Sequence, residues 1–135
     1  MSRAISSFTL AVALLAGAAA FASSGHRYVT DCNKIKDRPS SITITCGDAN
    51  AAAIDLHWDM FGGTKAHGSG KFAYNDCKPS CAAGSGKTVP AAITLRGAKS
   101  CGSKTVYHEM IVHFLHTVPK GYRRYEPFLL GCPTG

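Results

Sequence analysis

The sequence has few acidic residues, because 8 Asp and Glu stand against 15 Lys and Arg in 135 residues. After the amino-terminal segment it also lacks any long apolar run, so we expect no membrane span beyond that segment. It contains no Gly-x-Ser-x-Gly stretch, which argues against the nucleophile elbow of serine hydrolases. The chain is therefore basic, and it contains a single tryptophan and six cysteines.

The amino end has the parts of a secretory signal peptide. Met-Ser-Arg precedes an apolar run over residues 8–19, and small residues lead up to Ala22. The run is shorter than the ~18 to 20 apolar residues that a membrane-spanning helix needs. We therefore predict a signal peptide over residues 1–22, cleaved after Ala22, and one secreted, extracellular β domain over residues 23–135.

All six cysteines lie in the predicted mature part. An even number of cysteines in a small exported chain predicts disulfide bridges, and the spacing of the cysteines offers no second close pair for a zinc site. We predict that neighbours along the chain pair. The expected bridges are Cys32 with Cys46, Cys77 with Cys81, and Cys101 with Cys132; a bridge from Cys46 to Cys77 or Cys81 stays open as an alternative.

Apolar and polar residues alternate in several stretches, which is typical of half-buried β-strands. The clearest case places five residues on a core face, namely Ala52, Ile54, Leu56, Trp58 and Met60. The following strand carries small residues, and we expect Trp58 to lie over Gly68 and Gly70. The pattern predicts an all-β domain: a small, disulfide-stabilised antiparallel sandwich or partly open barrel of five or six strands.

Three segments depart from this pattern. Residues 23–40 are basic and have no apolar period, so we expect an amino-terminal arm held by its cysteine. Residues 97–104 are expected to form a loop. The run Thr105–Val118 is apolar on both faces, and its periodicity leaves a central strand or a buried helix open, although its β-branched and aromatic content favours a strand.

Several groups of residues together resemble a family of small secreted actinobacterial proteins of uncharacterised function. The matching marks are Cys46-Gly47-Asp48-x-Asn50, His57-Trp58, Gly62-Gly63, Ala66-x-Gly68-x-Gly70 and Asn75-x-Cys77-x-Pro79-x-Cys81-Ala82-x-Gly84. The resemblance covers most of the predicted mature chain and supports the strand interpretation of Thr105–Val118. It implies a scaffold and no particular reaction.

Few residues suggest chemistry. Alternate strand residues lie ~6.6 Å apart, so Asp55, His57 and Asp59 on one strand face could hold a cation or form an acid and base pair. A solvated strand face accounts for the same residues, and we favour it. We also expect Trp58, Phe61 and the glycine turn that follows to be a place for contacts. No cofactor or metal is predicted.

The basic residues suggest anionic partners. Without residues 1–22 the chain has 14 Lys and Arg against 8 Asp and Glu, and Lys120, Arg123 and Arg124 cluster beside tyrosines in the tail. Outside the cell such a cluster would meet anionic envelope polymers sooner than nucleic acid. We predict a non-enzymatic extracellular module that binds an unidentified partner, such as an envelope polymer or another extracellular protein. The alternatives are a small extracellular hydrolase or metal-dependent enzyme, and a basic protein that binds anionic cell-envelope polymers.

Overall fold

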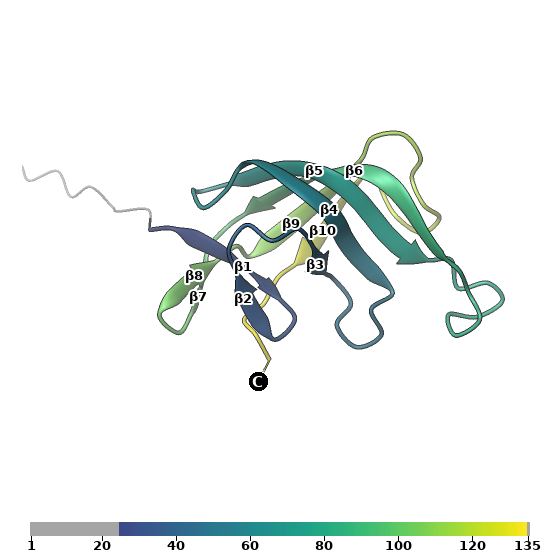
Figure 1. Cartoon of the computed structure of the whole chain (residues 1–135), viewed down its shortest axis with the longest axis horizontal. Coiled ribbons are helices and arrows are strands. Elements are labelled where there is room, and N and C mark those ends of the chain that lie inside the picture. The colour runs from purple at the N-terminus through teal and green to yellow at the C-terminus, as the bar shows by residue number, and fades with distance from the viewer. Residues whose placement is uncertain (1–24, 135) are drawn as a thin grey trace, which may run out of the picture.

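The computed structural model describes residues 25–134, so the predicted signal peptide lies outside the described residues. Ten β-strands and no helix occur in this part of the chain (Figure 1). The strands are β1 (Arg27–Asp31), β2 (Lys34–Lys36), β3 (Ile42–Thr43), β4 (Ala51–Met60), β5 (Ala66–Asn75), β6 (Gly86–Arg96), β7 (Lys99–Cys101), β8 (Lys104–Val106), β9 (Glu109–Phe114) and β10 (Tyr125–Leu129).

The strands form two sheets. The larger sheet has six antiparallel strands in the order β10-β9-β6-β5-β4-β3, and Figure 1 shows it curving over like part of a barrel wall. The smaller sheet has the order β2-β1-β8-β7, in which β1 and β8 are parallel. The predicted class, an all-β and partly open antiparallel structure stabilised by disulfides, is confirmed.

The core lies on one face of the six-stranded sheet, where alternate residues of its long strands point inward. Phe72 of β5 and Phe114 of β9 are fully buried, and their rings meet edge to face with centroids 5.2 Å apart. Burying one such side chain stabilises the fold by about 1.5–3 kcal/mol. We call the opposite face of this sheet, which carries the alternate polar residues, the outer face.

The predicted core face of β4 is correct at Leu56 and Trp58 and wrong at Ala52, Ile54 and Met60. Met60, which follows a second shift in the pairing after Trp58, is 55% exposed. Ala51 and Ala53 are buried, whereas the expected core residues Ala52 and Ile54 are only half-buried. A β-bulge at Asp55, whose φ is 52°, shifts the pairing by one residue before Leu56. One extra residue in a strand of period two reverses which residues face the core.

The predicted contact of Trp58 is confirmed for Gly68, whereas Gly70 lies against Leu56 and the backbone of β4 instead. Trp58 is the direct partner of Gly68 across the two strands. A Cβ atom on Gly68 would lie 2.5 Å from the carbonyl oxygen of His57 and 2.9 Å from the Trp58 ring. A Cβ atom on Gly70 would lie 2.6 Å from the carbonyl oxygen of Ile54, beside the bulge. Both glycines therefore allow β4 to approach β5 closely.

The predicted arm and the predicted loop at residues 97–104 are hairpins instead. Residues 27–36 form β1 and β2, and Val29 of β1 is fully buried. Residues 99–106 form β7 and β8, and β8 pairs with β1. These polar segments become strands because they pair with each other across a long stretch of chain, which local periodicity does not reveal.

The strand interpretation of Thr105–Val118 is confirmed for Glu109–Phe114, whereas residues 105–106 belong to β8 of the smaller sheet and residues 115–118 follow the strand as a loop. β9 lies between β6 and β10, and its residues Met110, Val112 and Phe114 are fully buried in the core. Its outer residues Ile111 and His113 are half-buried. Because the outer side chains of this central strand are themselves half-buried, neither face of the segment is plainly polar.

The three predicted disulfides are all present. Cys32–Cys46 ties the β1–β2 hairpin to the turn before β4, and Cys77–Cys81 closes the loop between β5 and β6. Cys101–Cys132 ties β7 to the segment after β10. Each bridge therefore holds a segment outside the six-stranded sheet, where few apolar contacts are available.

The close approach of β4 to β5 predicts a sharp difference between two neighbouring substitutions. Gly68→Val should destabilise the fold by about 2–4 kcal/mol, because its side chain would collide with backbone and with Trp58. Ser69→Val points to solvent on the outer face and should change the free energy of unfolding by less than about 0.5 kcal/mol. Denaturant unfolding of both variants measures this difference, and equal stability would contradict the described pairing.

The free edge of β10 is guarded by a proline. Phe114 N–H donates to the Arg124 carbonyl, and Leu130 N–H donates to the His108 carbonyl. Arg124 and Leu130, at the two ends of β10, therefore belong to hydrogen-bonded pairs with the neighbouring chain of β9. Such pairs alternate along an antiparallel ladder. The backbone groups of Tyr125, Pro127 and Leu129 therefore point to the free edge, where Pro127 offers no N–H.

Pro127→Val should make this edge competent to pair with a second copy. The new N–H adds backbone hydrogen bonds of about 0.5–1.5 kcal/mol each to such a pair. We expect sedimentation velocity to show a concentration-dependent dimer of the variant that the wild type does not form. Leu129→Val, which leaves the backbone donors of the edge unchanged, should behave as the wild type does. A monomeric Pro127→Val variant would contradict the guarding role.

Candidate functional site

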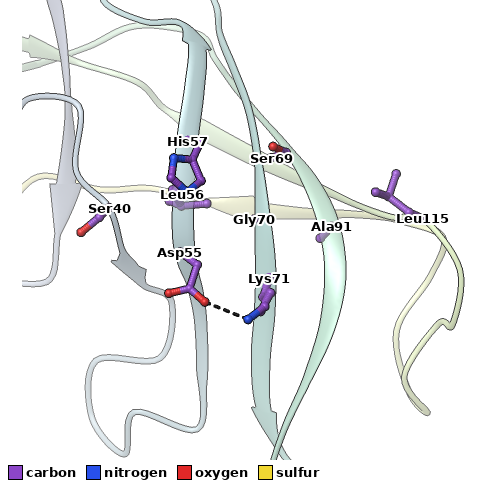
Figure 2. Close-up of a pocket in the computed structure, with 9 residues that line it drawn as sticks. All are labelled: Ser40, Asp55, Leu56, His57, Ser69, Gly70, Lys71, Ala91 and Leu115. Atoms are coloured by element: carbon purple, nitrogen blue, oxygen red, sulfur yellow. Dashed lines mark ion pairs between the residues drawn. The ribbon is translucent and has the colours of Figure 1, made fainter.

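The predicted residues Asp55 and His57 border a shallow hollow of about 600 Å³ on the six-stranded sheet. Its lining includes Gly70 of β5 and its direct partner Ala91 of β6. Figure 2 shows the lining residues on the three adjacent strands β4, β5 and β6, with Ser40 on the loop before β3 and Leu115 directly after β9. They are Ser40, Asp55, Leu56, His57, Ser69, Gly70, Lys71, Ala91 and Leu115. We call this hollow the trough.

The three residues Asp55, His57 and Asp59 do not converge. The Asp55 carboxylate lies 3.0 Å from the Lys71 ammonium, as the dashed line in Figure 2 marks. Asp59 instead lies 3.2 Å from His67 Nδ1 and does not line the trough. Within residues 25–134, no group of three His, Cys, Asp or Glu side chains could hold a metal ion. Each carboxylate thus has its own cationic or imidazole partner on an exposed surface.

Ser69 is a trough residue that the sequence did not single out. It is the direct partner of His57 across β4 and β5, which places Ser, His and Asp55 side chains near one another. A nucleophile and its base should lie within hydrogen-bond reach, at ~2.6 to 3.2 Å. Among the described residues, no hydrogen bond joins His57 to Ser69 or to Asp55. In an antiparallel pair, the expected pairing of Trp58 with Gly68 also places His57 opposite Ser69, so this residue could have been identified from the sequence.

Trp58 and Phe61, the predicted contact residues, turn inward. Trp58 Nε1–H donates to the Pro39 carbonyl at 2.7 Å, and the Trp58 and Phe61 rings meet edge to face with centroids 5.0 Å apart. The buried hydroxyl of Tyr107 accepts from Gly62 N–H and donates to the Gly63 carbonyl, both at 2.9 Å. Burial raises the pKa of this hydroxyl, so it stays a neutral donor. The turn is held rigidly against the core.

A second hollow, of about 500 Å³, lies where the loop between β5 and β6 meets the segment between β9 and β10. Three lysines from distant segments surround it: Lys78 in the disulfide loop, Lys87 at the start of β6, and Lys120. The rings of Tyr74 and Tyr122 contribute to its wall, with centroids 6.5 Å apart. We call this hollow the lysine groove.

Asp76, the one acidic residue that lines the lysine groove, is engaged by its own loop. Its Oδ1 accepts from Ser85 N–H at 3.0 Å and from Lys78 N–H at 3.2 Å, and its Oδ2 lies 3.4 Å from the Lys87 ammonium. The backbone hydrogen bonds, that from Ser85 first, hold the pKa of Asp76 below its ordinary value. One negative charge therefore faces three positive charges.

The motif residues around this loop build its turns. The Asn75 side chain donates to the Cys81 carbonyl at 2.8 Å and accepts from Cys77 N–H at 2.9 Å. Asn75 N–H also donates to the Asn50 carbonyl at 3.0 Å, which joins two of the marks that define the family resemblance. A side chain on Gly84 would collide with Asn75 Oδ1. Asn and Gly at these positions serve the turn and need no ligand to explain them.

Of the three basic tail residues, only Lys120 lines the lysine groove. Arg124 donates from Nη1 to the carbonyls of Phe114 and His116, at 2.7 and 3.0 Å, and so closes the loop between β9 and β10. The Arg123 side chain pairs with Glu126 at 3.4 Å. Sequence reasoning missed Lys78 and Lys87, because only folding brings their segments to Lys120.

Comparisons of this chain with family models, with curated proteins and with solved structures each returned no match. The resemblance to small secreted actinobacterial proteins therefore stays a prediction. Within residues 25–134 the structure has no helix that is long and apolar enough to span a membrane.

Protonation of Asp76 should loosen the loop beside the lysine groove. Because folding lowers the pKa of this carboxyl, its stabilising effect is complete above the ordinary aspartate pKa and is lost as the pH falls through the lowered value. In an NMR titration, the Ser85 and Lys78 amide signals should move with a midpoint below that of an ordinary aspartate. Asp76→Asn should remove this transition while the amides of β9 stay unaffected. A midpoint at the ordinary value would contradict the hydrogen bonds described.

Proposed function

We propose that the protein is an exported, non-enzymatic binding module that takes anionic groups of an extracellular polymer in the lysine groove. The proposal rests on one observation: Lys78, Lys87 and Lys120 come from three separate segments and surround one hollow of about 500 Å³. Their charges outnumber the single carboxylate of Asp76. Clefts lined by charge of one sign concentrate ligands of the opposite sign.

The surroundings of the groove support binding. The disulfide Cys77–Cys81 and the hydrogen bonds of Asn75 hold the loop that carries Lys78, so little ordering is needed when a ligand arrives. Tyr74 and Tyr122 are half-buried, and their rings offer apolar surface beside the ammonium groups. Such a surface suits a polymer in which anionic groups alternate with carbon-rich units.

The magnitude of the expected interaction favours a polymer over a single small anion. An exposed ion pair contributes about 0–1 kcal/mol, so three lysines would bind one anionic group only at about millimolar concentration or more weakly. A polymer offers many groups at high local concentration, and the apparent affinity rises accordingly. The predicted export of the chain would bring the groove to anionic envelope polymers.

A hydrolase is supported less well. The Asp55, His57 and Ser69 side chains share an exposed strand surface, but the carboxylate of Asp55 contacts Lys71 instead of orienting the imidazole. A catalytic arrangement of this kind requires the carboxylate to hold the base in place. We therefore do not propose a hydrolytic activity.

Changing Lys78, Lys87 and Lys120 together to Ala should weaken binding to poly(glycerol phosphate) about tenfold in low-salt buffer. Each lost ammonium removes about 0.5 kcal/mol of attraction, and salt screens the same attraction in the wild type. Isothermal titration or retention on an immobilised polymer measures the difference.

The matched control changes three lysines outside the groove, Lys34, Lys65 and Lys99, to Ala. It lowers the net charge equally and should weaken binding less than about threefold, because only general attraction is reduced. Equal weakening of the two triple variants would contradict a groove and indicate that the whole basic surface binds. An absence of binding by the wild type would contradict the proposed function.

A further inference from the structure

A row of side chains crosses five strands of the outer face, next to the trough. Direct strand partners connect Tyr125 of β10 to His113 of β9, then to Ala92 of β6, Ser69 of β5 and His57 of β4. Direct partners point to the same face of a sheet. Four spacings of about 4.8 Å make the row roughly 19 Å long, and its last two members also line the trough.

One end of the row is an aromatic platform. The Tyr125 ring is stacked on the His113 ring, with centroids 4.2 Å apart and planes inclined by 14°. Tyr125 is nevertheless 60% exposed. One face of the ring therefore rests on the imidazole, and the other face is open to solvent. A ring held flat in this way is ready to stack, because little side-chain freedom remains to be lost.

The other end of the row is polar but close to neutral. Asp55 and Lys71 offset each other's charge across the trough at 3.0 Å, Ser40 and Ser69 add hydroxyl groups, and His57 adds an imidazole. The set contains a carboxylate that accepts, an ammonium that donates, and hydroxyls that do both. The trough thus differs in charge from the lysine groove.

We propose that the row and the trough together bind a neutral oligosaccharide chain. A pyranose ring has an apolar C–H face that stacks on Tyr125, and hydroxyl groups that donate and accept at Asp55, Lys71 and Ser69. The small side chain of Ala92 leaves room for the chain to cross the strands between these two contact points. A protein partner fits less well, because the middle of the row offers little apolar area.

This inference does not rest on the proposed function of the lysine groove, since the two sites share no residue. Binding at the row should be insensitive to salt, because its charged groups are already paired. It should also be unaffected by Lys120→Ala. A polymer of the cell envelope that carries both sugars and anionic groups would engage both sites.

Cellohexaose and chitohexaose are suitable probes, because their β-linked rings present flat faces. Titration of the protein with each probe should shift the NMR amide signals of His57, Ser69 and His113 in the wild type. Tyr125→Ala should weaken binding about three- to tenfold by removing the stacking surface. Tyr125→Phe keeps the ring and should bind within about twofold of the wild type.

Leu129→Ala is the matched control, because Leu129 lies on the same strand and face as Tyr125 and is 77% exposed. It should bind the probes as the wild type does. Equal weakening by Leu129→Ala and Tyr125→Ala would mean general apolar adhesion and would overturn the proposal. If the amide signals of the row do not shift at a saturating concentration of either probe, the proposal is also overturned. This holds whether or not the lysine groove binds poly(glycerol phosphate).

Discussion

The close approach of β4 and β5 at two glycines is the contact on which the described structure depends. Gly68 leaves room for the Trp58 ring, and Gly70 leaves room for the bulge at Asp55. The bulge reverses the alternation of β4, which buries Leu56 and directs Asp55 and His57 outward. A side chain at either glycine would separate the strands that carry both the core and the trough.

The bulge in β4 also separates polar groups that stabilise the fold from polar groups that face solvent. On the far side of the bulge, the Trp58 ring packs on Phe61, which packs on the buried Tyr107. Trp58 Nε1–H holds the loop before β3, and the Tyr107 hydroxyl holds the glycine turn. The trough keeps Asp55 and Lys71 in contact with solvent and nearly neutral as a pair. The lysine groove lies on other segments and has a positive excess. Two hollows that differ in net charge therefore lie on one framework.

Local patterns predicted the elements that are half-buried and regular. The period of two in β5, β6 and β9 reports one covered face, and the parity of the cysteines in a small chain predicted bridges that the structure contains. The hairpins β1–β2 and β7–β8 were missed, because their residues are mostly polar and are ordered by pairing between distant segments. The bulge was missed because the residues of β4 continue to alternate between apolar and polar types from Ile54 to Asp59. That pattern does not reveal the extra residue that changes which side chains face the core.

The sequence by itself determined the fold class and the alternation of residues between the two faces of the regular strands β5 and β6. These depend on the spacing of apolar and polar residues along a single strand, which is a local property. The tertiary structure alone decided that Lys78 and Lys87 join Lys120, that Arg124 closes a loop, and that Tyr125 and His57 end one row across the sheet. Such groupings follow from strand order and register, which bring together residues that no local spacing relates.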